Sequence, residues 1–163
     1  MFSKYTKYNH KGVSLIELMV VIAIIGIMSS IGFALWQSSK NATYLDIAQR
    51  EVASAVRAAQ SYALQGKRLS SGVPSTYGVG FTANNAYCIY HDSFNAGNCI
   101  ETFALNNGVV LRGFSAGSNV VFFNVPFGDR SSSGNITWTF EHGGTSMTKS
   151  IVIYPSGKVE ELQ

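Results

Sequence analysis

An uninterrupted apolar run constrains most strongly what this chain can fold into. Residues 13–36 contain a single charged side chain, Glu17. A run of at least about 18 apolar residues is long enough to cross a bilayer as a helix. A secretory signal is cleaved after its apolar core, whereas here the best processing position, Gly12, precedes that core. Cleavage at Gly12 would remove residues 1–12 and keep the apolar segment in the mature protein.

The first 12 residues also differ from the rest of the chain in charge. The chain has 12 Lys and Arg and 9 Asp and Glu, and three of the basic residues are Lys4, Lys7 and Lys11. The mature chain would therefore be formally neutral, although the whole chain carries +3. A basic segment before an apolar helix is expected to stay in the cytoplasm. The neutral remainder lacks the broad basic footprint of a nucleic-acid-binding protein.

The junction at Gly12 resembles a known kind of leader. Gly12, the segment Val13–Leu18 and the apolar run after it resemble the class III leader of type IV pilins and type II secretion pseudopilins. In that family a prepilin peptidase cuts after the glycine and methylates the new N-terminus. The resemblance implies a leader at residues 1–12, cleavage between Gly12 and Val13, and N-methylation of Val13. It also implies a bacterial inner-membrane protein whose β domain lies in the periplasm and which assembles with other subunits.

Glu17 is costly in an apolar helix. A carboxylate costs about 2.5–3.5 kcal/mol at the bilayer centre on insertion scales, and less near an interface. This cost allows two interpretations. In the first, the side chain extends to the lipid headgroups, and in the second it stays unpaired until a positively charged group of a partner binds it. The family resemblance implies the second, with the N-terminal amine of a neighbouring subunit as the partner, so that Glu17 acts in assembly.

The segment that follows the leader is expected to form one long helix, because it lacks proline as far as Gly66. At 1.5 Å per residue this helix would approach about 80 Å. Residues 13–36 would be its transmembrane or filament-core half, and residues 37–66 its amphipathic half, with Gly66 as C-cap. The apolar stripe of the second half is Leu45, Ala48, Val52, Ala55, Val56, Ala59, Ala63 and Leu64. For Gly26 and Gly32, close helix packing and local melting both stay open.

Residues 67–163 are expected to form a β-rich globular domain. Short β-prone runs separated by turn residues predict strands at 76–82, 86–91, 100–105, 109–112, 119–125, 135–141, 149–154 and 158–160. Asn107-Gly108 predicts a hairpin between the third and fourth of these strands. Strands at this spacing favour antiparallel sheets. The predicted fold class is α+β, with a long N-terminal hydrophobic helix packed on a C-terminal antiparallel β domain.

Two cysteines, Cys88 and Cys99, bound a short polar loop. If the domain is exported, a disulfide between them is expected. Two free buried thiols are the alternative. A zinc site needs four ligands, and only His91 lies close in sequence, so no metal is expected.

The second half of the chain resembles a subgroup of the same superfamily. Its short motifs, together with the alanine-rich helix Gln49–Gln65, resemble the GspH/FimT group of minor pilins and pseudopilins. These motifs are Pro126–Gly128, Gly134–Trp138, Ser150–Tyr154 and Ser156–Val159. The resemblance implies a low-abundance subunit that helps to initiate or cap a type IV pilus or a type II secretion pseudopilus.

Catalysis has little support in the sequence, and neither an enzyme nor a cofactor is expected. Only His91 and His142 remain as histidines after leader removal, and no G-x-S-x-G elbow is present. The carboxylates considered, Asp92, Asp129, Glu101 and Glu141, are scattered along the chain.

A binding role is the alternative function. Some members of the subgroup are receptors at the filament tip, for DNA or for a surface. Arg112, Arg130 and Lys149 are candidates for a local basic patch, although the chain ends with two acids after Lys158. Nucleic acid is therefore an unfavoured but open partner.

Overall fold

The computed structural model describes residues 12–70, 72–115, 118–130, 132–143 and 145–162. The chain divides after Ser39 into two compact units. A single helix, α1 (Leu15–Gln65), begins in the first unit and continues into the second.

In the first unit, α1 is apolar around its whole circumference. The helix continues without a break through Gly26 and Gly32, so no local melting is seen. The hydroxyl of Ser30 donates to the carbonyl of Ile27 at 2.7 Å. This polar side chain is therefore satisfied within the helix, as an apolar surrounding requires.

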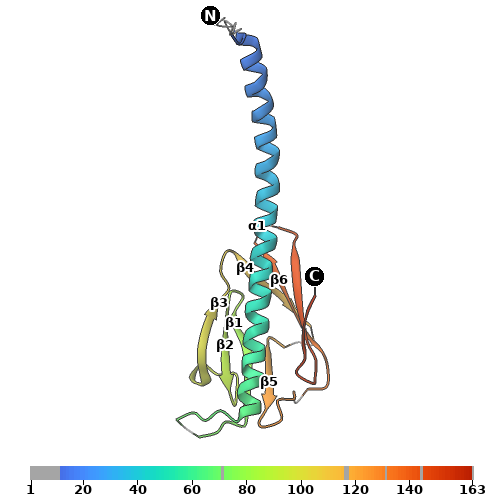
Figure 1. Cartoon of the computed structure of the whole chain (residues 1–163). Helices are drawn as coiled ribbons and strands as arrows, with labels where there is room; N and C mark the ends of the chain where they lie inside the picture. The colour runs from blue at the N-terminus through green and yellow to red at the C-terminus, as the bar shows by residue number, and fades with distance from the viewer. Residues whose placement is uncertain (1–11, 71, 116–117, 131, 144, 163) are drawn as a thin grey trace, which may run out of the picture. The chain divides into compact units, whose positions relative to one another are not determined.

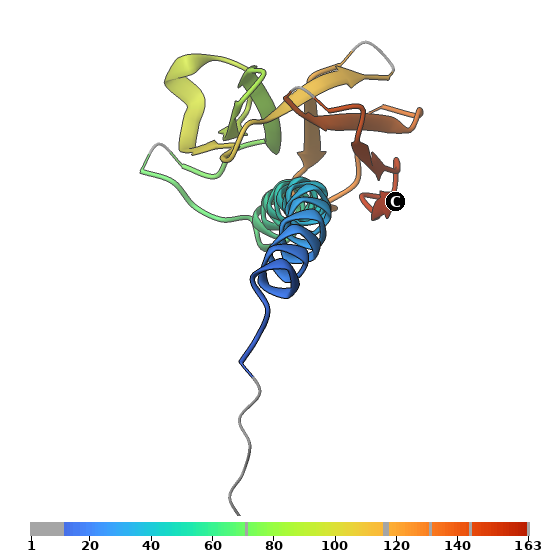
Figure 2. The same cartoon turned by 90° about the horizontal axis from the view of Figure 1, so that it is seen from above.

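The second unit contains the rest of α1 and two four-stranded antiparallel sheets (Figure 1). The first sheet has the order β3-β2-β1-β5 and the second the order β4-β6-β7-β8. In chain order the strands are β1 (Thr76–Ala83), β2 (Ala86–His91), β3 (Cys99–Ala104), β4 (Val109–Phe114), β5 (Val120–Asn124), β6 (Ile136–His142), β7 (Thr148–Ile153) and β8 (Val159–Leu162). The predicted α+β fold class is confirmed, and Figure 2 shows the strands gathered on one side of the part of α1 that belongs to this unit.

The core forms where the stripe of α1 meets the inner faces of both sheets. Seven of the eight predicted stripe residues are buried, and Ile136, Trp138 and Phe140 line one face of β6 as their alternation predicts. The prediction was wrong for Leu64, which is 54% exposed and lies against the backbone of Gly128. It also missed Ala53, which is fully buried.

Gln49 is a buried polar residue within this core. Its side-chain nitrogen donates to the carbonyl of Ser150 on β7 at 2.7 Å and to that of Leu162 on β8 at 2.9 Å. Gln49 thereby attaches the last two strands to the helix.

The C-cap predicted at Gly66 is confirmed. Gly66 has a φ of +55°, which is favourable for glycine. The amide of Gly66 donates to the carbonyl of Ala63, and the amide of Lys67 donates to that of Tyr62. These two bonds form a Schellman motif, which satisfies carbonyls at the helix end.

The hairpin predicted at Asn107-Gly108 was wrong. Both residues have positive φ, 58° and 75°, so the tight turn itself is present. The strands on its two sides enter different sheets, because β3 pairs with β2 whereas β4 pairs with β6. The turn therefore carries the chain from the first sheet to the second.

Candidate functional site

The N-terminal segment is the part of the chain whose residues depart most from an ordinary folded surface. By length and composition α1 is apolar enough to cross a membrane. Val13, just before the helix, is exposed, and so are large apolar side chains on every side of the helix itself: Leu15, Ile16, Leu18, Met19, Val20, Val21, Ile22, Ile24, Ile25, Ile27, Met28, Ile31, Phe33 and Trp36. Contiguous apolar surface of this extent marks a site that membrane or protein covers.

The start of α1 brings together the residues assigned to processing and assembly. The helix begins at Leu15, two residues after Val13, and its first turn contains Glu17. An acid in the first turn interacts favourably with the amide groups at a helix N-terminus. Of the predicted leader, only Gly12 lies within the described residues, and it is exposed.

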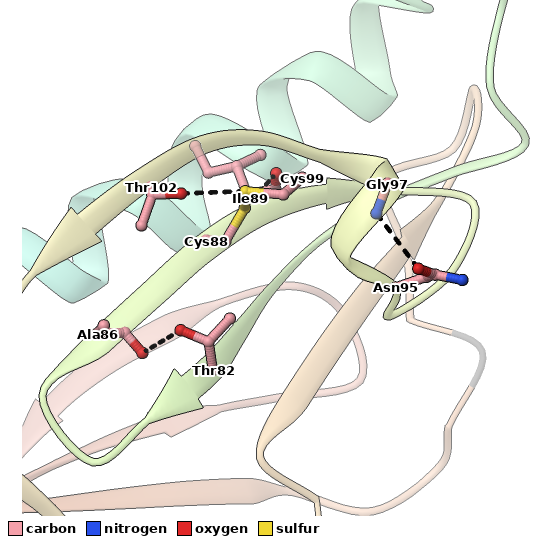
Figure 3. Close-up of a disulfide and its surroundings, with 8 residues drawn as sticks. All are labelled: Thr82, Ala86, Cys88, Ile89, Asn95, Gly97, Cys99 and Thr102. Carbon is pink, nitrogen blue, oxygen red and sulfur yellow. Dashed lines mark hydrogen bonds between the residues drawn. A yellow bond between two sulfur atoms is a disulfide. The ribbon is translucent and has the colours of Figure 1, made fainter.

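The disulfide between Cys88 and Cys99 is present and links β2 to β3 (Figure 3). Cys88 is buried in β2, and Cys99 opens β3, with 5.9 Å between the two Cα atoms. In the enclosed loop, the Asn95 side chain accepts a hydrogen bond from the amide of Gly97 and caps a short 3-10 turn. The bridge therefore closes the polar loop at the edge of the first sheet.

The scattered polar residues do not converge into a catalytic site. His91 pairs with Asp92 at 3.1 Å, and Asp92 also accepts hydrogen bonds from the amide and hydroxyl of Ser75. Partial burial alone would raise the pKa of Asp92, but these hydrogen bonds outweigh it and lower that pKa below its usual range. In the described parts of the chain, His, Cys, Asp and Glu form no cluster suited to a metal ion.

The three residues suggested for a basic patch each have a partner within the chain. Arg112 pairs with Glu141 at 3.0 Å, and Lys149 pairs with Asp46 on α1. Arg130 is 6% exposed and donates to the carbonyl of Ile153 at 2.7 Å.

Comparison with known proteins points to one superfamily. The prokaryotic N-terminal methylation motif matches residues 7–33, which include the Gly12 junction and Glu17. Two curated fimbrial proteins of Pseudomonas aeruginosa are 43% identical over 75 residues, which cover 44% of this chain and 49% of each relative. The chain thus spans about half the length of the curated relatives it matches.

Solved structures share the fold. The type IV minor pilin FimU of Pseudomonas aeruginosa matches with a TM-score of 0.57 and 12% identity, over 73% of this chain and 93% of FimU. The minor pseudopilin EpsH of the type 2 secretion system of Vibrio cholerae matches with a TM-score of 0.51 and 12% identity, over 72% of this chain and 95% of EpsH. The chain is thus similar to type IV pilins and pseudopilins in its N-terminal methylation motif, in a 75-residue sequence match and in its fold.

In this pilin-like chain the strongest functional signal was readable from the sequence, because it is a contiguous motif. A groove between α1 and the first sheet could not be predicted from the sequence. Its residues Glu51, Tyr87 and Glu101 come from three elements, and no local pattern predicts that they meet.

Proposed function

We propose that this chain is a minor pilin or pseudopilin, a structural subunit that helps to initiate or cap a filament. The observation that carries the proposal is the methylation motif at residues 7–33, placed directly before an exposed apolar helix. The fold shared with FimU and EpsH, which are a minor pilin and a minor pseudopilin, supports the finer assignment. Both a type IV pilus and a type II secretion pseudopilus are compatible with it.

Processing comes first in this proposal. A prepilin peptidase cuts between Gly12 and Val13 and methylates the amine of Val13. Residues 13–36 then anchor the chain in the bacterial inner membrane, residues 37–66 continue the helix, and the β domain at residues 67–163 lies in the periplasm. The Cys88–Cys99 disulfide supports this placement, because disulfides persist in oxidising compartments such as the periplasm.

Glu17 acts at the next step, when the subunit leaves the membrane for the filament. The N-terminal amine of a neighbouring subunit is its proposed partner. Within the described residues Glu17 takes part in none of the ion pairs. Pairing in the filament would remove the cost of an isolated carboxylate in apolar surroundings.

A receptor role at the filament tip is the weaker alternative. Nucleic-acid binding depends on basic side chains that are free to contact phosphates. Because Arg112, Arg130 and Lys149 are paired or buried, we do not propose DNA as a ligand.

The deciding experiment measures the intact mass of the membrane-extracted protein, expressed with and without a prepilin peptidase. Loss of residues 1–12 and gain of one methyl group are expected only with the peptidase. Substitution Gly12→Val should block this change, while Gly26→Ala, a matched change inside the apolar helix, should leave it intact. An uncut chain in the presence of an active peptidase would overturn the proposal.

A second measurement separates assembly from processing. Glu17→Gln should be cleaved and methylated but should be lost from sheared filaments, whereas the distant Glu160→Gln should enter them normally. Quantitative mass spectrometry of those filaments should find few copies of this chain relative to the main subunit. A comparable copy number would contradict the minor role.

A further inference from the structure

A groove of about 600 Å³ lies between α1 and the β2–β3 side of the first sheet. This volume is within the range of ligand-binding clefts. Helix α1 contributes Glu51, β2 contributes Tyr87, and β3 contributes Glu101 and Phe103. All of these residues belong to the second unit of the chain.

The register of β3 explains why a carboxylate faces the groove. Tyr87 lies opposite Phe103, and Ile89 lies opposite Glu101, so the four side chains share one face of the sheet. Tyr87 and Ile89 are buried members of the core. Glu101 therefore stands on the core-side face of β3, a strand that ends its sheet and pairs only with β2 in the strand order.

Two acids and one hydroxyl of the groove, from Glu51, Glu101 and Tyr87, have no polar partner among the described residues. Neither Glu51 nor Glu101 belongs to any ion pair among the described residues. Tyr87 is 3% exposed, and its hydroxyl makes no hydrogen bond within the described structure, although this oxygen is not one of the fully buried atoms that lack a partner. Burial, and then the negative charges of Glu51 and Glu101, raise the pKa of Tyr87 to about 12, so the hydroxyl stays protonated.

Two aromatic side chains, Tyr87 and Phe103, line the groove. The rings of Tyr87 and Phe103 stack with 5.2 Å between their centroids and 16° between their planes. Two carboxylates that line one groove favour a cation close to both of them. Aromatic rings accept the stem of a basic side chain and attract its charged head.

We propose that this groove binds an arginine or lysine side chain from an extended segment of a partner polypeptide. The cationic head lies between Glu51 and Glu101, and its stem packs on the partly exposed ring of Phe103. The backbone of the segment runs along β3, whose outer edge offers unpaired amide and carbonyl groups. A charge facing inward can also protect an edge strand from aggregation, and the test must separate this role from binding.

The test uses the full-length chain in detergent micelles and two fluorescent seven-residue peptides. Both peptides alternate threonine and valine around a central residue, which is arginine in one and citrulline, its neutral analogue, in the other. Fluorescence anisotropy should show binding of the arginine peptide at least about tenfold tighter than that of the citrulline peptide. This comparison needs no substitution in the protein.

Variants then localise the site. Glu51→Gln and Glu101→Gln should each weaken binding of the arginine peptide by about tenfold. Glu161→Gln, a change in an acid that pairs with Arg57, is the matched control and should not alter binding. Circular dichroism checks that every variant is folded.

Four outcomes would overturn the proposal. Equal binding of the two peptides, or no binding of either at millimolar concentration, would exclude a cation-selective polypeptide site. Arginine amide that binds as tightly as the arginine peptide would reassign the groove to a small cation. Aggregation of Glu101→Gln without loss of peptide binding would leave edge protection as the role of that carboxylate.

Discussion

Reduction of the Cys88–Cys99 disulfide should lower the free energy of unfolding of the second unit by about 3 kcal/mol. The two cysteines are 11 positions apart. In the loop-entropy relation, a closed loop of this length reduces the entropy of the unfolded chain by about 9 cal/mol/K, or about 2.8 kcal/mol at 25 °C. The bridge joins neighbouring strands that already pair, so reduction leaves the β2–β3 ladder available to form.

Urea unfolding of the full chain in detergent measures this change. Trp36→Phe leaves the buried Trp138 as the only tryptophan, so fluorescence then reports on the core of the β domain. With an m-value of about 1–3 kcal/mol/M, reduction should lower the midpoint by about 1–3 M urea.

The matched control is the pair Cys88→Ala and Cys99→Ala, measured with and without reductant. Its midpoint should not respond to the reductant, because no bridge is left to break. The entropic reasoning would be refuted if reduction lowered the free energy of unfolding of the bridged chain by less than about 1 kcal/mol. It would fail equally if the alanine pair responded to reductant as the bridged chain does.

Three further predictions use the same unfolding assay. Gly157→Ala should destabilise by about 1–3 kcal/mol, because φ is +82° and a Cβ atom would lie 2.0 Å from the Gln60 side chain; an unchanged midpoint would contradict this. Gln49→Leu should cost about 1–3 kcal/mol, since two strand carbonyls lose their donor, whereas exposed Gln65→Leu should cost under about 0.5 kcal/mol. The folded state lowers the pKa of Asp92. The ionised carboxylate therefore adds to the free energy of unfolding above its unfolded pKa of about 3.9, and this stabilisation is lost as the pH falls through the folded-state pKa. In Asp92→Asn, the free energy of unfolding should therefore decrease less steeply as the pH is lowered. An unchanged pH dependence would show that Asp92 does not contribute to it.

Local patterns predicted the elements of this fold well. A proline-free segment with a recurring apolar stripe predicted α1, and Gly66 predicted its end. Alternation in β6 predicted which of its side chains are buried. These patterns depend only on residues that are close in sequence, so a single sequence is enough to predict the elements.

Predictions failed where the outcome depends on residues far apart in sequence. Asn107-Gly108 specifies a tight turn, but the turn does not determine whether the next strand joins the same sheet. Arg130 lies in a polar loop by composition, yet the carbonyl of Ile153 gives its guanidinium a buried partner. Glu51 and Glu101 each look like solvated acids, and only the packing of α1 on β3 brings them to one groove.

The two halves of α1 require different surroundings. Beyond Leu45 the helix buries one stripe against the sheets, whereas its N-terminal half exposes apolar side chains all round. That half must be covered by lipid or by other apolar helices, and the hydrophobic effect distinguishes poorly between these two environments. On the proposed function, the preference for the filament must then come largely from packing and from polar terms. Glu17 is the only charged side chain among residues 13–36, so its pairing with an amine is the electrostatic term that this segment can contribute.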